Sequence, residues 1–282
     1  MVRRAYLKEA LKDSLTPTQV ALISSGLDII GDIAIIRVPE TLSKSKEKIG
    51  VKLIEKMKNI KTVLSQTSPV EGNYRIRRLE FLAGEKKTAT LHKEYGCLFK
   101  VDLSKTYFSP RLSYERLRIA SQVTADEVVI NMFAGAAPFS ILIAKIQPRV
   151  KVYSIDVNPS SHRLAMENIR LNKVIDRVEA IQGDARDVIL KSLKEVGNRI
   201  LMPLPEQSLE YLDSAVSALT PQGGIIHLYT HLHADKDENG VAKAEQLALS
   251  KLNASAEVIT GRVVKEVGPR WRQIVLDIKV KK

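Results

Sequence analysis

Apolar segments of strand length alternate with segments of helical spacing from about residue 106 onward. This rhythm is typical of a parallel α/β sheet, because a parallel connection must cross from one end of the sheet to the other and usually does so as a helix. In such sheets, ligands bind beyond the carboxyl ends of the strands. The pattern predicts strands at 127–132, 150–156, 178–181, 199–202 and 224–229, helices at 113–121, 139–146 and 160–171, and antiparallel edge strands in the tail at 271–280.

The first part of the chain has a different pattern, in which short apolar runs and one amphipathic segment follow each other without regular alternation. The pattern predicts a strand at 33–36, a helix at 43–58, extended structure at 62–64 and two strands within 88–103 that turn at Tyr95-Gly96. We therefore expect a small α+β domain over residues 1–105 and an α/β domain over residues 106–282.

The positive charge is concentrated in the first part of the chain. The whole sequence has a net charge of +12, and residues 1–120 hold 23 Lys and Arg against 13 Asp and Glu, a net of +10. Such a basic part can attract a polyanion, although charge alone is equally consistent with a solvated surface. Arg75, Arg77 and Arg78 point more clearly to nucleic-acid binding, because a guanidinium can bind a phosphate through two hydrogen bonds and can stack on a base.

Other features exclude several classes of protein. Cys97 is the only cysteine, so no disulfide forms within the chain and a cysteine zinc site is not expected. No apolar run approaches the roughly 20 residues of a membrane span, and no apolar signal core follows the N-terminus. We expect a soluble, cytoplasmic protein without a metal site. We expect His227, His231 and His233 to lie in a loop near a strand end rather than on a metal.

Three features at the ends of successive predicted strands indicate a cofactor. The small-residue turn 131–138 lets a ligand approach the backbone, Asp156 can accept both ribose hydroxyls of an adenosine, and Asp184 can contact the adenine amino group. Each feature alone has a plainer explanation, such as a helix cap, but the ordered set favours a cofactor. It resembles a class I S-adenosylmethionine methyltransferase, with departures at Asn131, where an acid is usual, and at Ala137, where a glycine is common.

Two longer segments extend the resemblance. Segments 107–116 (YFSPRLSYER) and 133–140 (FAGAAPFS) closely resemble the archaeal and eukaryotic tRNA (guanine-37-N1)-methyltransferase family, which includes wyosine-pathway methyltransferases. Segments 75–85 and 92–97 support it. The resemblance implies a Rossmann-like class I methyltransferase domain preceded by a small domain that binds the tRNA anticodon stem-loop, in a monomer. Larger members carry an extra N-terminal domain, and we expect this chain to begin after it.

The resemblance also implies roles for individual residues. N1 of guanine is protonated at neutral pH, so its methylation needs a base for that proton and a cation near O6. Glu115 matches the base, Arg75 the residue that stabilises O6, and Tyr107 a residue near the target guanine. Without the resemblance, an ion pair of Glu115 with Arg116 or Arg118 is the plainer reading. The implied cofactor-binding residues are Phe133, Ala134, Gly135, Ala136, Asp156, Asp184 and Arg116, and the implied substrate-binding residues are Arg111, Pro203 and Pro205.

One departure leaves the acceptor atom open. Pro203 stands where the family usually has an Asn that holds the target guanine, and proline has neither an amide side chain nor a backbone donor. The first expectation is methylation of guanosine 37 at N1. The alternative is methylation of the tricyclic wyosine precursor at the same tRNA position, and a non-catalytic RNA-binding homologue is a further one. The related aminocarboxypropyl transferases usually lack the Ser-Pro-Arg-Leu pattern, so Arg111 argues against that branch.

Segment 269–272 is predicted either to contact RNA or to place Trp271 in the core.

Overall fold

The computed structural model describes residues 2–24 and 26–282, and the chain divides into two compact units, residues 1–113 and residues 114–282. The boundary falls at the start of helix α4 (Ser113–Gln122). That the first unit binds tRNA and the second binds a cofactor stays a prediction.

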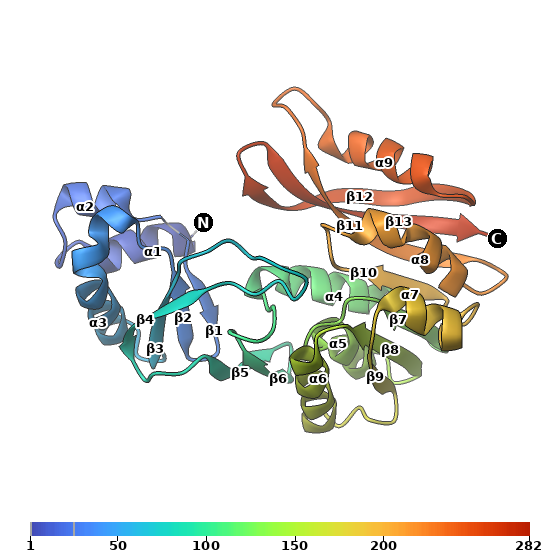
Figure 1. Ribbon diagram of the computed structural model, residues 1–282, viewed down its shortest axis with the longest axis horizontal. Coiled ribbons are helices and arrows are strands. Elements are labelled where there is room, and N and C mark those ends of the chain that lie inside the picture. The colour runs from blue at the N-terminus through green and yellow to red at the C-terminus, as the bar shows by residue number, and fades with distance from the viewer. Residues whose placement is uncertain (1, 25) are drawn as a thin grey trace. The chain divides into compact units, whose positions relative to one another are not determined.

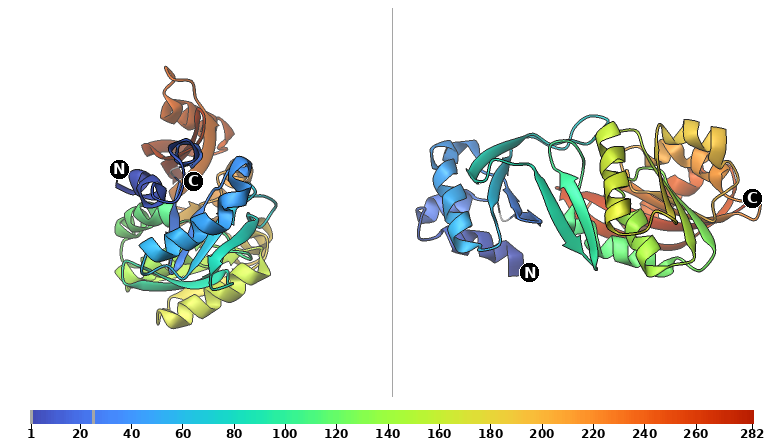
Figure 2. Two further views of the ribbon diagram at one scale, coloured as in Figure 1. Left: turned by 90° about the vertical axis from the view of Figure 1, so that its left-hand side faces the viewer. Right: turned by 90° about the horizontal axis from the view of Figure 1, so that it is seen from below.

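The first unit is built on a four-stranded sheet with the order β1-β2-β3-β4, in which β2 and β3 are parallel and the other neighbours are antiparallel. Helices α1 and α3 pack on this sheet through an apolar cluster that includes Leu7, Ile49, Leu53 and Val63 (Figure 2). Ile49 and Leu53 are four residues apart and so share one helix face. The elements are α1 (Val2–Leu11), α2 (Pro17–Leu22), β1 (Asp28–Ile30), β2 (Ile33–Ile36), a 3-10 helix (Glu40–Ser45), α3 (Lys46–Lys56), β3 (Thr62–Gln66) and β4 (Leu79–Gly84).

A separate hairpin follows, formed by β5 (Ala89–Glu94) and β6 (Cys97–Asp102). Its turn lies at Tyr95 and Gly96, which both have positive φ (45° and 76°), as a tight two-residue hairpin turn requires. The turn between β1 and β2 abuts this hairpin, and a Cβ on Gly31 would lie 2.2 Å from Thr90 Oγ1. The hairpin and the turn predicted at 95–96 are confirmed.

The second unit is a seven-stranded sheet with the order β12-β13-β11-β10-β7-β8-β9 (Figure 1). Strands β9, β8, β7, β10 and β11 are parallel neighbours, and β13 and β12 are antiparallel. The strands are β7 (Glu127–Asn131), β8 (Val150–Asp156), β9 (Val178–Gln182), β10 (Arg199–Met202), β11 (Gly224–His233), β12 (Ser255–Gly268) and β13 (Trp271–Lys281). The helices after α4 are α5 (Pro138–Ile146), α6 (Pro159–Leu171), α7 (Ala185–Val188) with a π-helical turn (Ile189–Leu193), a 3-10 helix (Ser208–Tyr211), α8 (Leu212–Ala218) and α9 (Gly240–Lys251).

The strand–helix alternation is confirmed, with two corrections at the end of the chain. The tail does form an antiparallel strand, but β13 lies between β11 and β12, so the edge strand of the sheet is β12. The loop expected around His227, His231 and His233 is wrong, because β11 continues to His233 and pairs with β13 along its whole length. Helices α1, α2, α7, α8 and α9 and strands β1, β4 and β12 were not foreseen.

The two faces of β11 and β13 differ in chemistry. Ile226, Leu228 and Ile274 belong to the apolar cluster that also contains residues of α7, α8 and α9. Because side chains alternate along a strand, His227, Tyr229 and Asp277 point to the opposite face. Helix α4 packs on that face, where its Arg118 donates to Asp277. The second face therefore holds a set of buried charged and polar groups beneath α4.

Glu127 and Arg199 form a two-point ion pair across β7 and β10, with Arg199 Nε 2.6 Å from Oε2 and Nη2 3.0 Å from Oε1. Burial tends to raise the pKa of Glu127, but the hydrogen bonds and charge of Arg199, together with the hydrogen bonds from Thr124, lower that pKa. A carboxyl whose pKa is lower in the folded state stabilises the fold above its unfolded pKa and loses that contribution as the pH falls.

We expect Glu127→Gln to lower the free energy of unfolding by about 1.5–3 kcal/mol at neutral pH, because Arg199 is left without its charge partner. The difference should shrink below about pH 4, where the unfolded carboxyl takes up its proton. Urea denaturation at several pH values measures it. Glu179→Gln, which removes a half-exposed pair with Lys151, is the control and should change stability by less than about 1 kcal/mol. A pH-independent difference would contradict the assignment.

Candidate functional site

The turn after β7 has the backbone geometry of a ligand-binding loop. Gly135 and Ala137 both have positive φ (57° and 63°), and Ala137 caps α5 in the left-handed conformation. The Ala134 N–H donates to Ile155 O (2.8 Å), which ties the loop to the end of β8. The loop is thus anchored on two neighbouring strands, and its small side chains leave its backbone accessible to a ligand.

Asp156, at the carboxyl end of β8, fixes this loop. Its Oδ2 accepts a hydrogen bond from Gly135 N (2.6 Å), and its Oδ1 accepts one from Asn158 N (2.9 Å). Burial raises the pKa of Asp156, and these two backbone donors act against that rise. An ionised carboxylate has about four acceptor positions, so both oxygens can also accept ligand hydroxyls.

Two buried polar atoms beside the loop lack a hydrogen-bond partner within the described part of the chain. They are Asn131 Oδ1 and Ser154 Oγ, and the two residues are paired in register at the ends of β7 and β8. Asn131 Nδ2 donates to Ser140 Oγ (3.1 Å), which leaves Oδ1 as the open acceptor. A buried polar atom without a partner costs about 1–3 kcal/mol, so this position suits a polar ligand group.

Asp184 follows β9 and lies in an aromatic and cationic setting. Its Oδ1 caps α7 by accepting from Arg186 N (2.8 Å), and its Oδ2 accepts from Tyr211 OH (2.7 Å). The rings of Tyr211 and Phe133 meet edge to face at 5.1 Å, and the Arg186 guanidinium lies 4.0 Å from the Tyr211 centroid. Burial and the bond to Asp184 raise the pKa of Tyr211 to about 12, so its hydroxyl stays a donor. Asp184 therefore caps α7, and the Phe133 and Tyr211 rings lie beside it.

Glu115 is 1% exposed and lies in the first turn of α4. Its Oε2 accepts from Arg118 Nε and from Tyr229 OH, both at 3.1 Å, and its Oε1 lies 2.9 Å from Arg262 Nη2. The expected ion pair with Arg118 exists. This ion pair belongs to a buried cage of Arg118, Tyr229 and Arg262 rather than to a solvated helix face.

The first unit brings three other predicted residues into two pairs. The Arg75 guanidinium lies 4.2 Å from the centroid of the Tyr107 ring. Arg111 donates to Asp28 Oδ1 (2.7 Å), so it is paired with an acid of the same unit. Arg75 itself has a φ of 54°, a backbone conformation that is uncommon for a residue with a side chain.

The segment after β10 is shaped by a buried hydroxyl. Ser208 Oγ contacts Met202 O (2.8 Å) and Leu204 O (2.7 Å), so it holds the turn that carries Pro203 and Pro205. Pro205 is buried and Pro203 is half-buried. Pro203 presents only a carbonyl to a ligand at this strand end.

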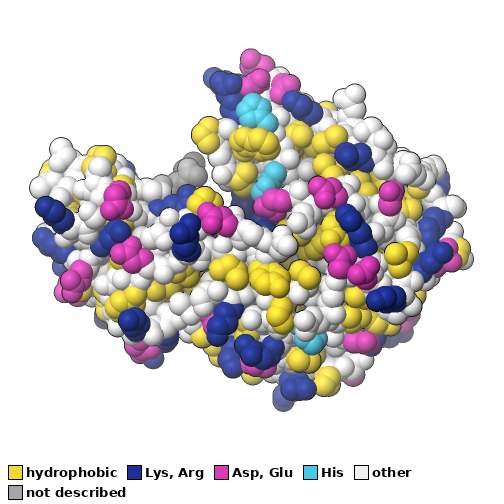
Figure 3. Space-filling view, viewed as in Figure 1, with side chains coloured by type: hydrophobic (Ala, Val, Ile, Leu, Met, Phe, Trp, Pro, Cys, Tyr) yellow, Lys and Arg dark blue, Asp and Glu magenta, His cyan; other side chains and the backbone are white. Residues whose placement is uncertain are grey.

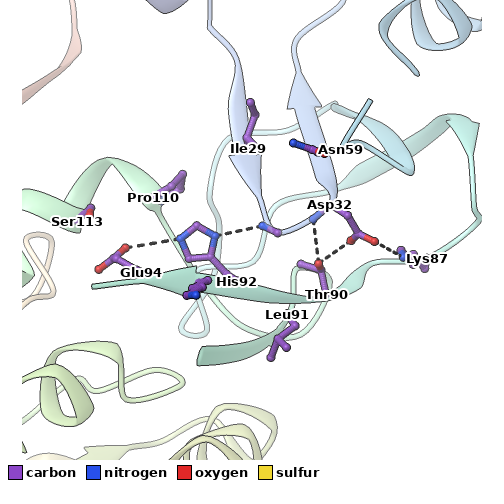
Figure 4. A pocket seen from close by; sticks show the side chains of 12 residues that line it. Ile29, Asp32, Asn59, Lys87, Thr90, Leu91, His92, Glu94, Pro110 and Ser113 are labelled. Atoms are coloured by element: carbon purple, nitrogen blue, oxygen red, sulfur yellow. Dashed lines mark hydrogen bonds and ion pairs between the residues drawn. The ribbon is translucent and has the colours of Figure 1, made fainter. Parts of the chain in front are cut away.

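A groove of about 780 Å³ lies in the first unit between the β1–β2 turn and β5 (Figure 4). His92 Nδ1 accepts from Gly31 N (3.1 Å), while Nε2 faces Glu94 Oε2 at 3.6 Å. Asp32 binds Lys87 and Thr90 on the other wall. These contacts hold the hairpin against the sheet. The polar side chains in the groove therefore have a structural role and do not require a bound ligand.

The surface shows no single basic stripe on the side drawn in Figure 3, where Lys and Arg side chains alternate with acidic ones. Among residues 2–24 and 26–282, no helix has the length and apolar character needed to cross a membrane. The same residues contain no group of three or more His, Cys, Asp or Glu side chains arranged to hold a metal ion.

Two family models match the chain. The model of the TRM5/TYW2 methyltransferase domain matches residues 90–256, and that of the TYW2 N-terminal domain matches residues 7–88. The chain belongs to the TRM5/TYW2 methyltransferase family. The first match contains Glu115 and the loop that Asp156 anchors, and the second contains Arg75.

Named relatives come from more than one branch of this family. The tRNA (guanine(37)-N(1))-methyltransferase Trm5b of Pyrococcus abyssi is 40% identical over 92% of this chain and 76% of its own length. The tRNA 4-demethylwyosine(37)-methyltransferase Taw21 of Saccharolobus solfataricus is 40% identical over 90% of this chain and 93% of its own length.

Solved structures agree with the sequence matches. The aTrm5 chain in a complex with tRNALeu has a TM-score of 0.84 and 38% identity over 96% of this chain and 76% of its own length. Methanocaldococcus jannaschii TYW2 in complex with AdoMet has a TM-score of 0.66 and 29% identity over 91% of this chain and all of its own length. The predicted Rossmann-like methyltransferase fold of this family member is confirmed.

The sequence analysis missed several residues around these carboxylates. Tyr211 beside Asp184, and Tyr229, Arg262 and Asp277 around Glu115 and Arg118, all come from distant parts of the chain. One sequence signal was available, since Asp277 is a lone acid inside the apolar run 274–278. Its partners on α4 and β11 follow only from the tertiary structure.

Proposed function

We propose that this protein transfers the methyl group of S-adenosylmethionine to the nucleotide at position 37 of tRNA, with N1 of guanine as the acceptor. The observation that carries the proposal is the caged carboxylate of Glu115, which lies in the same unit as the loop held by Asp156. The names of the relatives in the Trm5b branch support the substrate. In this proposal the basic N-terminal part of the chain contributes to tRNA binding.

The residues at the ends of β7, β8 and β9 fit S-adenosylmethionine. When bound, this cofactor supplies an electrophilic methyl group on a sulfonium. In our proposal Asp156 accepts the ribose hydroxyls, Asp184 receives the adenine amino group, and the open acceptor of Asn131 receives the ammonium of the methionine part. The remaining cofactor-binding residues are Phe133, Ala134, Gly135, Ala136 and Arg116.

In our proposal Glu115 takes the proton from N1 as the new N–CH₃ bond forms. Where loss of this proton runs ahead of bond formation, negative charge develops on the base, chiefly on O6, and the Arg75 guanidinium stabilises it. The bond between the methyl group and the sulfonium sulfur breaks as the N–CH₃ bond forms, so the methylated base is neutral and a thioether is released. Tyr107, which carries Arg75 against its ring, contacts the target base. Arg111, Pro203 and Pro205 bind the substrate. The target base has to leave its stack to reach a protein pocket.

A second acceptor remains a candidate because of Pro203. In the sequence pattern of the N1-methylating enzymes, an Asn at this position offers an amide to guanine, whereas Pro203 offers only its carbonyl. Taw21, which is named for 4-demethylwyosine, is as similar in sequence to this chain as Trm5b is. We therefore carry methylation of the tricyclic wyosine precursor at position 37 as the alternative.

One experiment separates the two acceptors. The protein is incubated with methyl-labelled S-adenosylmethionine and either of two tRNAs, one with unmodified guanosine 37 and one with the tricyclic precursor. Mass spectrometry then identifies the labelled nucleoside. We expect 1-methylguanosine. Label only on the tricyclic base would establish the alternative. Absence of label from both tRNAs would indicate a non-catalytic homologue, which binds the cofactor without turnover.

Glu115→Gln should lower the single-turnover rate of methyl transfer by about 100-fold or more, because it removes the base and keeps the shape of the side chain. The affinity for tRNA should stay within about twofold of wild type. Glu179→Gln, on the exposed face of β9, serves as the control with an unchanged rate. A rate for Glu115→Gln equal to that of wild type would remove Glu115 from the mechanism.

Asp156→Ala should weaken S-adenosylmethionine binding by about 10- to 100-fold, since it deletes both the ribose acceptor and the anchor of Gly135. Isothermal titration calorimetry measures the dissociation constant directly. Asp176→Ala, which removes an exposed carboxylate paired with Arg177, is the matched control. Equal affinities in all three proteins would refute the ribose role.

A further inference from the structure

The two carboxylate oxygens of Glu115 have different surroundings. Oε2 is held by two donors from the interior, Arg118 Nε and Tyr229 OH. Among the described residues, Oε1 meets only Arg262 Nη2, in an ion-pair contact at 2.9 Å that lacks the alignment of a hydrogen bond. Arg262 comes from the edge strand β12, and its side chain is 34% exposed. One oxygen is therefore fixed from inside the unit, and the other is covered by a partly solvated side chain.

Arg118 is itself fixed by a second carboxylate. Its Nη1 and Nη2 donate to Asp277 Oδ2 (2.5 Å) and Oδ1 (3.1 Å), while its Nε is left for Glu115. The guanidinium thus bridges two acids, and its planar fork sets the direction of the donor that reaches Glu115. Asp277 lies on β13, next to both β11 and β12 (Figure 1).

Asp277 is held in turn by groups from every element around it. His227 Nε2 lies 2.8 Å from Arg199 Nη1, which can only donate, so Nε2 accepts and Nδ1 carries the ring proton. Nδ1 therefore donates to Asp277 Oδ1 at 2.6 Å. Burial lowers the pKa of His227, which keeps the ring neutral. Thr260 Oγ1 (3.1 Å) and Gln122 Nε2 (3.2 Å) complete the set of donors to Asp277.

These contacts keep Asp277 ionised throughout the working pH range. Burial alone would raise the pKa of Asp277, but the bonds from His227 and Arg118 hold it far below its usual value. A buried ion pair is a poor way to stabilise a sheet, because well-packed apolar side chains do so at least as well. The geometry is better suited to orienting a group than to adding stability.

We propose that Asp277 is a positioning residue for Glu115: it locks the guanidinium of Arg118, which fixes Oε2 and leaves Oε1 as the oxygen that takes the proton from the target base. The inference rests on the proposed function, in which Glu115 is the base. Arg262, stacked 4.9 Å from the centroid of the exposed Tyr114 ring, covers Oε1 and moves aside when the base enters. The N1–H bond then breaks as the Oε1–H bond forms.

The test combines Asp277→Asn with Glu115→Gln in single-turnover methylation of tRNA. Asp277→Asn should lower the rate by roughly 10- to 100-fold, as misplacement of a reacting group does, with the KM values for tRNA and S-adenosylmethionine within about twofold. In the Glu115→Gln background it should cause no further loss, because the group it positions is already gone. Glu179→Gln, which removes a half-exposed ion pair with Lys151 and lies outside this network, is the control with an unchanged rate.

The outcomes are separable. If Asp277→Asn lowered the rate by the same factor in the Glu115→Gln background as in the wild type, the proposal would be overturned, since a residue that only supports the fold has that effect. An active Glu115→Gln enzyme would overturn it together with the role of Glu115 in the proposed function. A normal rate for Asp277→Asn beside an inactive Glu115→Gln would overturn the proposal alone.

If the Asp277→Asn variant does not fold, Arg118→Lys provides a second test of the same proposal. Lysine retains the charge, but its single ammonium cannot bridge Asp277 and Glu115 as a guanidinium does. We expect the same loss of rate with unchanged KM values, again absent in the Glu115→Gln background. A wild-type rate in Arg118→Lys would show that the bridge is not needed.

Discussion

The pairing of β13 between β11 and β12 is the constraint on which the candidate base depends. Ten residues of β11 pair with β13 in one uninterrupted register, and this places His227 directly opposite Asp277. Because alternate side chains face opposite sides of a sheet, the same register puts Tyr229 beside them under α4. The pairing of these two strands therefore positions the hydrogen-bond partners of Arg118 and Glu115.

The other half of the site follows from the parallel part of the sheet. Parallel neighbours end at the same edge, so the loop after β7, Asp156 after β8 and Asp184 after β9 meet there. The Gly135–Asp156 hydrogen bond shows how closely the first two are linked. The proposed cofactor-binding residues are therefore held at strand ends, whereas Glu115 is held by contacts between segments that are distant in the sequence.

The sequence analysis succeeded where one segment carries its own information. The strand at 199–202 and the turn at Tyr95-Gly96 could be read from periodicity and spacing, and both are confirmed. The turn 131–138, Asp156 and Asp184 lie at the ends of successive strands as expected, and their binding of a cofactor stays a prediction. The loop expected at His231 and His233 was wrong, because β11 continues beyond the predicted strand 224–229 as far as His233 and pairs with β13 throughout. The partners of His227 within that strand, Arg199 and Asp277, lie 28 and 50 residues away, so no local pattern could reveal them.

The sequence by itself determined the α/β class, the family and the residue types at the strand ends, because these depend on local pattern and on motifs within single segments. Only the tertiary structure decided that Glu115 is buried in a cage of Arg118, Tyr229 and Arg262 rather than exposed on a helix. The reason is physical: burial and ion pairing are properties of groups that meet through the fold, and no local pattern encodes which distant strand supplies the partner.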